Sequence, residues 1–195
     1  MKNKYSFSTM VATFFGSGFI PWAPGTFASA LTFILYFLLI FIMTKIKGGI
    51  MGMSSPDLIN SMMVFFTALF FIGVWATDQY CFITKKQDPK EVVIDEVVGQ
   101  ALTIMIITFF LPFVGYDIVI KFYQKFGMNE ETLVWFNLLS SFILFRIFDI
   151  FKPWPINYID QKYKNAFGVM FDDVVAAIFA GIVHFFILFA IVDRI

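Results

Sequence analysis

Four short polar motifs interrupt an otherwise apolar chain, and each carries residue types that can bind a metal ion or a phosphate. They are PGT at 24–26, IDEVVGQ at 94–100, RIFDIFKPWP at 146–155 and FDDVVAA at 171–177. Ionisable residues within apolar segments are costly in free energy and usually serve a function. Their repeated occurrence therefore indicates a functional site.

The acidic residues of these motifs are candidate metal ligands: Asp95, Glu96, Asp149, Asp172 and Asp173. Carboxylates that lie close together repel one another unless a cation sits between them. A site made only of carboxylate oxygens suits Mg²⁺, with Mn²⁺ as a second possibility, and offers zinc none of its preferred nitrogen or sulfur ligands. We therefore expect a Mg²⁺ site.

The basic residues Arg146 and Lys152 are candidate phosphate ligands. Arg146, Asp149 and Lys152 follow one another at intervals of three, so on a helix they share one face. Pro153 and Pro155 then predict the end of that helix. Two cations at a helix end could bind the charged oxygens of a phosphate.

Gly25 and Thr26 are candidate substrate-binding residues for a different reason. The apolar run that follows Pro24 predicts a helix that starts at these residues. Free N–H groups and the helix dipole at such a start attract anions such as phosphate. Together with the carboxylates and the cations, this pattern describes a site for phosphoryl transfer.

Structural roles are the alternative for each motif. Asp172 and Asp173 could be helix N-caps, and Asp95 and Glu96 could be the same. Arg146 and Asp149 could form a structural ion pair. The only histidine, His184, is expected to pack or to form a hydrogen bond between helices rather than to act as a catalyst.

The elements that must position these motifs are membrane helices. Hydrophobic residues make up 59% of the chain and charged residues only 14%, whereas about 25% is usual in soluble domains. Helices that cross a bilayer need about 20 apolar residues. Such runs occur at 27–44, 60–77, 97–115, 132–149 and 174–192. We predict an all-α, polytopic membrane helix bundle with about five spans, in one domain over residues 1–195.

The N-terminal segment is apolar but short, and Gly16 and Gly18 interrupt it. We expect a re-entrant or interfacial helix there. Lys2, Lys4 and the ASA at 28–30 also resemble a cleavable signal peptide. That interpretation is disfavoured because the PWAPG at 21–25 interrupts the apolar stretch.

The distribution of basic residues predicts the orientation. With five spans and a cytoplasmic N-terminus, nine basic residues lie inside and five outside, which agrees with the positive-inside rule. All four polar motifs then lie on the cytoplasmic side. The net charge of zero gives no indication of a nucleic-acid partner, and the single cysteine, Cys81, excludes a metal cluster built from cysteines.

Four sequence blocks resemble the signatures of the phosphatidylglycerophosphatase A family, in the same order. They are FGSGFIPWAPGTFAS, VVIDEVVGQ, FRIFDIFKPWPINYID and GVMFDDVVA, and they extend from residue 15 to 176. The resemblance implies a Mg²⁺-dependent phosphatase of the bacterial cytoplasmic membrane. The substrate of such an enzyme would be phosphatidylglycerophosphate and its product phosphatidylglycerol. The resemblance indicates no obligate protein partner.

The residues that carry the resemblance include the candidates above. The family's acidic positions fall on Asp95, Glu96, Asp149, Asp172 and Asp173, and the other matching positions are Gly25, Thr26, Gly99, Arg146 and Lys152. As a hypothesis, Asp172 or Asp173 is the general base, although attack by a carboxylate to form an aspartyl-phosphate stays open, as does the number of metal ions. A cation-coupled transporter is the alternative function. It would place its carboxylates near the middle of the membrane rather than at one surface.

Overall fold

The computed structural model describes residues 6–46, 55–110 and 115–193, and these residues form helices and connecting loops without a β-strand. The predicted all-α fold class is confirmed. Along the chain the elements are α1 (Phe7–Ala12), the 3₁₀-helix η1 (Ser17–Phe19), α2 (Pro24–Ile46), α3 (Ser55–Thr84), α4 (Ile94–Met105), the π-helix η3 (Ile106–Phe110), α6 (Tyr116–Phe126), α7 (Glu130–Phe151), α8 (Ile156–Lys162) and α9 (Ala166–Asp193).

Four helices in the described part of the chain are long and apolar enough to cross a membrane. The qualifying segments are Pro24–Ile42, Ile59–Thr84, Glu131–Phe151 and Ala166–Val192, with mean hydropathy between 1.7 and 2.7. They correspond to four of the five predicted spans. Large apolar side chains such as Phe41, Phe71 and Phe186 are exposed on these helices, as expected for surfaces that face lipid. The chain is therefore a membrane protein.

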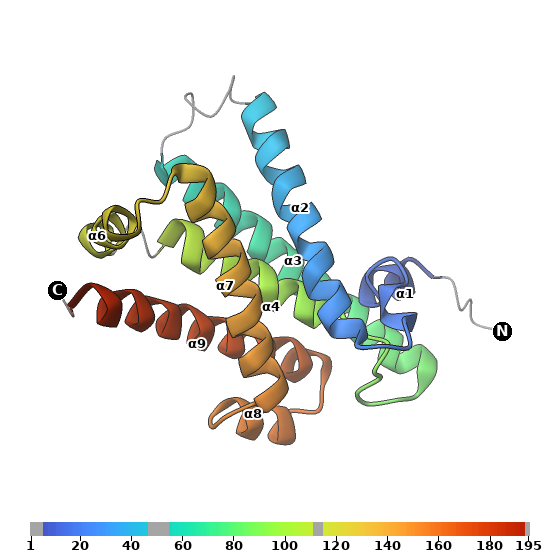
Figure 1. The fold of residues 1–195 in the computed structure, drawn as a ribbon. Coiled ribbons are helices and arrows are strands. Elements are labelled where there is room, and N and C mark those ends of the chain that lie inside the picture. The colour runs from blue at the N-terminus through green and yellow to red at the C-terminus, as the bar shows by residue number, and fades with distance from the viewer. Residues whose placement is uncertain (1–5, 47–54, 111–114, 194–195) are drawn as a thin grey trace.

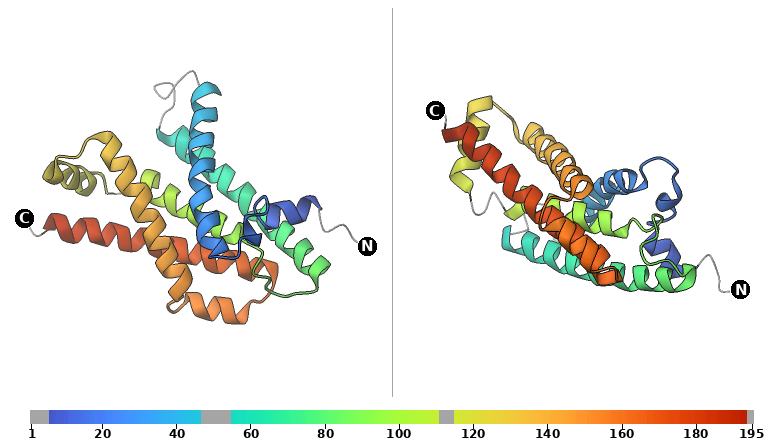
Figure 2. Two further views of the ribbon diagram at one scale, coloured as in Figure 1. Left: turned by 45° about the vertical axis from the view of Figure 1, so that its right-hand side comes forward. Right: turned by 90° about the horizontal axis from the view of Figure 1, so that it is seen from below.

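The remaining predicted span, 97–115, has a different structure. It consists of α4, the π-helix η3 and residues 111–114, which lie outside the described residues. Most residues of α4 are buried, because α2, α3, α7 and α9 all pack against it. In Figures 1 and 2, α4 lies in the middle of the bundle. This central position lets α4 present polar side chains to its neighbours instead of to lipid.

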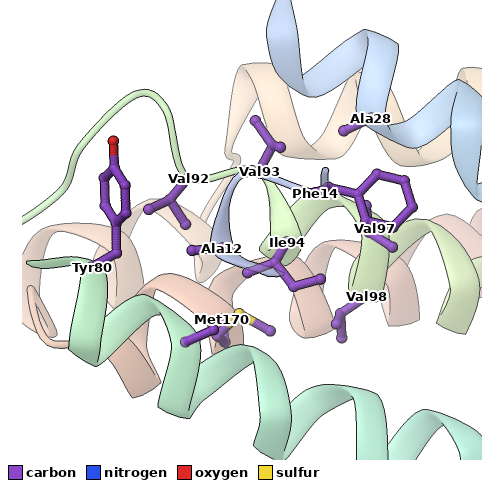
Figure 3. Close-up of a cluster of buried hydrophobic side chains, with 11 residues drawn as sticks. Ala12, Phe14, Ala28, Tyr80, Val92, Val93, Ile94, Val97, Val98 and Met170 are labelled. Carbon is purple, nitrogen blue, oxygen red and sulfur yellow. The ribbon is translucent and has the colours of Figure 1, made fainter. Parts of the chain in front are cut away.

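The N-terminal segment contains the short helix expected there. Ser6 caps α1, with its hydroxyl accepting from the N–H of Thr9, and the chain then turns through left-handed residues at 14–16 into η1. The N–H of Val93 donates to the carbonyl of Ala12 at 3.0 Å. Figure 3 shows the buried cluster that holds this segment in place, formed by Ala12, Phe14, Ala28, Ala76, Tyr80, Val92, Val93, Ile94, Val97, Val98 and Met170. The segment therefore packs directly beside the start of α4.

The ends of α7 and α9 place two of the polar motifs. α7 ends at Phe151, immediately before Lys152 and the two prolines, as predicted. α9 begins at Ala166, earlier than the predicted 174, and the side chain of Asn165 accepts from the N–H of Gly168 at this start. Asp172 and Asp173 therefore lie inside α9, and their interpretation as N-caps is wrong.

Candidate active site

Three carboxylates from two helices converge at the centre of the site. Asp95 and Glu96 lie in the first turn of α4 and Asp173 lies in α9. One ligand oxygen from each residue falls within 4.8 Å of the other two. Asp173 is 2% exposed, whereas Asp95 and Glu96 are half-buried. Like charges at this separation, shielded from water, need a compensating positive charge.

Unpartnered oxygens in this cluster fit a bound cation. Glu96 Oε2 and Asp173 Oδ2 are buried and have no hydrogen-bond partner among the described residues. Buried polar atoms without partners are rare in native structures and usually indicate an ion or a water. Because the three groups offer only oxygen ligands, a hard divalent ion such as Mg²⁺ fits the arrangement.

Arg146 and Asp149 lie on one face of α7, as their spacing predicted, and they form the ion pair that was the structural alternative for them. Arg146 Nη1 also donates to Ser29 Oγ on α2 at 3.5 Å. Arg146 Nε is buried without a partner in the described residues. Asp149 interacts electrostatically with both Glu96 and Asp173. The pair therefore belongs to the same site as the three carboxylates.

Lys152 is the C-cap of α7 and has a left-handed backbone with φ of 41°. Its ammonium donates to Asp172 Oδ2 at 2.5 Å and to Asp160 Oδ1 at 3.0 Å. Burial alone lowers the pKa of Lys152, but the charge and hydrogen bond of Asp172 outweigh this effect and raise the pKa above its usual value. Lys152 therefore stays positively charged at neutral pH.

Two residues at the site had no predicted role, Asp160 and Ser29. Asp160 lies in α8 and contacts Lys152, and it is the only acidic residue between Lys152 and Asp172 in the sequence. That isolation within a family-like block is the signal that could have identified it. Ser29 lies on α2, three residues after Thr26 of the PGT motif. Nothing in the sequence around Ser29 indicates its contact with Arg146.

Two glycines bring the helices together at the site. A Cβ atom at Gly25 would overlap Glu96 Oε1, and one at Gly99 would lie 2.5 Å from the ring of Phe145 and 3.1 Å from Cβ of Asp173. Gly25 is buried in the first turn of α2, and its neighbour Thr26 is half-buried. The glycines explain how α2, α7 and α9 can all approach α4 closely.

His184 lies away from this cluster, in the C-terminal half of α9. It is 2% exposed, its Nδ1 lies 3.1 Å from Ser140 Oγ of α7, and its ring packs near Phe136. The predicted role as an interhelical hydrogen-bonding residue is confirmed. The structure thus brings together predicted residues from all four motifs, shows no contact between Thr26 and the other site residues in its described part, and keeps His184 apart from the cluster.

Comparisons with known proteins show which proteins the chain is similar to. The family model for Phosphatidylglycerophosphatase A matches residues 10–189. Phosphatidylglycerophosphatase A of Haemophilus influenzae is 34% identical over 178 residues, covering 90% of this chain and 85% of that protein. The Escherichia coli protein of the same name is 29% identical, covering 90% of this chain and 81% of that protein.

A Bacteroides thetaiotaomicron protein named "Putative phosphatidylinositol-3-phosphatase" is 29% identical over 93% of this chain and 94% of its own length. No solved structure matches the chain. Because the family model covers nearly all of the sequence and the relatives align over most of their lengths, the chain belongs to the phosphatidylglycerophosphatase A family of phosphoric monoester hydrolases.

Proposed function

We propose that the chain is a Mg²⁺-dependent phosphatase that hydrolyses phosphatidylglycerophosphate to phosphatidylglycerol and phosphate in phospholipid biosynthesis. The convergence of Asp95, Glu96 and Asp173, with two buried oxygens that lack partners, is the observation that carries this proposal. Membership of the family supports the lipid substrate. We infer that residues 1–195 form one membrane-embedded domain.

The three carboxylates of this cluster would hold the metal ion. Asp149 and Asp172 each form an ion pair with a basic residue. They would therefore lie beside the three metal ligands and balance the positive charges of Arg146 and Lys152. A bound Mg²⁺ would neutralise phosphate charge and lower the pKa of a water molecule. The same chemistry is open to Mn²⁺.

The basic residues would stabilise the charge on the phosphoryl group during its transfer. Arg146 keeps a buried N–H without a partner in the described residues, and a guanidinium can donate two parallel hydrogen bonds to a phosphate. Lys152 adds a fixed positive charge. Gly25 and Thr26, at the start of α2, would donate backbone N–H groups.

A carboxylate near the phosphate would accept the proton of the attacking water. Asp173 has a buried, unpartnered oxygen, whereas the Oδ2 of Asp172 accepts from Lys152. Either residue could serve as the general base. Positive charge from Arg146 and Lys152 would stabilise the transition state.

The position of the site at helix ends suits a lipid substrate. The acyl chains could stay in the bilayer beside the exposed faces of the spanning helices, while the headgroup reaches the ends of α2, α4 and α7. The excess of basic residues in the predicted inner loops supports a location in the bacterial cytoplasmic membrane with the site facing the cytoplasm.

Phosphate release by the detergent-purified protein tests the substrate. We expect Mg²⁺-dependent release from phosphatidylglycerophosphate at a kcat/KM at least about tenfold above that for phosphatidylinositol 3-phosphate. The second lipid is included because one relative carries that name. A preference for phosphatidylinositol 3-phosphate would contradict the proposed substrate, and release from neither lipid would contradict the proposed function.

A further inference from the structure

A series of charged side chains connects the surface of the molecule with the carboxylate cluster. Lys164 Nζ lies 3.5 Å from Asp160 Oδ2, Asp160 Oδ1 lies 3.0 Å from Lys152 Nζ, and Lys152 Nζ lies 2.5 Å from Asp172 Oδ2. Side-chain exposure falls along this series from 42% at Lys164 to 3% at Asp172. The ammonium of Lys152 is thus held by carboxylates from two different helices, α8 and α9.

The backbone conformation of Lys152 does not determine the position of its ammonium group. A C-cap in the left-handed conformation is usually glycine or asparagine, and a residue with a Cβ atom is strained there. The side chain of lysine is long and flexible, with several rotatable bonds. Its partners therefore decide where the positive charge lies.

The two carboxylates have different surroundings, which indicates different roles. Asp172 lies inside α9, next to Asp173 of the cluster. Asp160 lies on the short helix α8, is 30% exposed, and also contacts Lys164. An ammonium has three N–H donors. Asp160 and Asp172 accept two of them in the described structure, which leaves one for a phosphate oxygen.

We propose that Asp160 is a positioning residue, which holds the ammonium of Lys152 so that its remaining donor is directed to the phosphate of the substrate. Without the charge of Asp160, the flexible lysine would be held only by Asp172. Its ammonium would then turn toward that carboxylate and away from the phosphate. This inference rests on the proposed function and assigns a role to a residue outside the carboxylate cluster.

A double-mutant cycle tests whether Asp160 acts through Lys152. The variants are Asp160→Asn, Lys152→Ala and the two combined, with phosphatidylglycerophosphate and Mg²⁺ as the assay. We expect Asp160→Asn to lower kcat and kcat/KM together by about tenfold, because the lost interaction is made in the transition state. The combined variant should fall within about twofold of Lys152→Ala alone.

Two further variants separate positioning from folding. Asp160→Glu keeps the charge and should recover at least about a third of the wild-type kcat. Asp88→Asn makes the same chemical change at an exposed loop residue and should keep kcat within about twofold. The melting temperature is measured on every variant.

Three results would overturn the inference. The first is an Asp160→Asn protein with normal kcat. The second is a combined variant in which the losses from Asp160→Asn and Lys152→Ala multiply. The third is an Asp160→Asn protein with a lower melting temperature but unchanged activity per folded molecule. Wild-type protein without Mg²⁺-dependent phosphate release would overturn the proposed function and this inference with it. An active wild type with an unaffected Asp160→Asn variant would overturn only the inference.

Discussion

The charged residues of the site are paired unequally. Arg146 pairs with Asp149, and Lys152 pairs with Asp160 and Asp172. The other three carboxylates, Asp95, Glu96 and Asp173, form no ion pair in the described part of the chain. Negative charge therefore exceeds positive charge around the cluster, and a cation would relieve this repulsion.

Asp149→Asn should lower turnover by at least about a hundredfold, or some 2.7 kcal/mol of transition-state stabilisation. The asparagine keeps the size of the side chain but removes the charge that acts on the cluster and holds Arg146. Specific activity and melting temperature should be measured on the same purified protein. A purely structural ion pair would give a lower melting temperature with near-normal activity per molecule, and a well-folded, fully active variant would contradict the catalytic role.

Lys152→Ala should also lower activity strongly, because it removes the charge assigned to the phosphate. We expect a loss of at least about thirtyfold in kcat. Lys162→Ala is the matched control, since Lys162 lies nearby on α8 but is exposed and bonds to the hydroxyl of Tyr158. Equal losses for the two lysines would show that general surface charge matters rather than Lys152.

At the scale of the helices, close approach at glycines builds the site. α2 meets the start of α4 at Gly25, and α7 and α9 meet the same helix near Gly99. Small residues at such contacts let helix backbones approach one another. The positions of the catalytic candidates thus depend on residues that carry no chemical group themselves.

Gly25→Ala should reduce activity more than stability, because the new methyl group would displace the carboxylate of Glu96. We expect a loss of about tenfold or more in kcat. Gly73→Ala is the control, since its methyl group would meet the flexible end of Met170 and lie 3.4 Å from Cγ1 of Ile94, both in the hydrophobic cluster. The comparison uses activity and melting temperature for both variants, and a fully active Gly25→Ala protein would contradict the close placement of Glu96.

Local patterns in the sequence predicted much of the fold and the site. Long apolar runs identified four spanning helices, and the prolines after Lys152 identified the end of α7. The patterns could not predict that α9 begins at Ala166, because its first turns are less apolar than the span itself. They also could not predict that Asp160 reaches Lys152, since this contact depends on how α8 packs against α9.

At the scale of the whole molecule, residues far apart in the sequence form one site at the ends of several helices. The start of α2, the start of α4, the end of α7 and the first half of α9 each contribute residues to it. If the long helices cross the membrane, this arrangement places the phosphate chemistry near one surface.

Cysteine accessibility can test that topology in a Cys81→Ser background. Single cysteines at Lys90, Lys162 and Lys125, all exposed in the structure, should be labelled by a membrane-impermeant reagent in intact and in opened cells. We expect positions 90 and 162 to face the cytoplasm and position 125 to face the other side, following the distribution of basic residues. Labelling of 90 and 162 from opposite sides would contradict a site on one surface.

The most direct test is phosphate release from phosphatidylglycerophosphate by the purified protein before and after removal of divalent metal. Because the three carboxylates that could hold a metal ion offer only oxygen ligands, we expect activity to fall by at least about a hundredfold with EDTA and to return with Mg²⁺ or Mn²⁺. An Asp173→Asn protein with unchanged melting temperature should stay inactive after Mg²⁺ is restored. Full activity that persists after exhaustive chelation would contradict a metal-dependent phosphatase at this cluster.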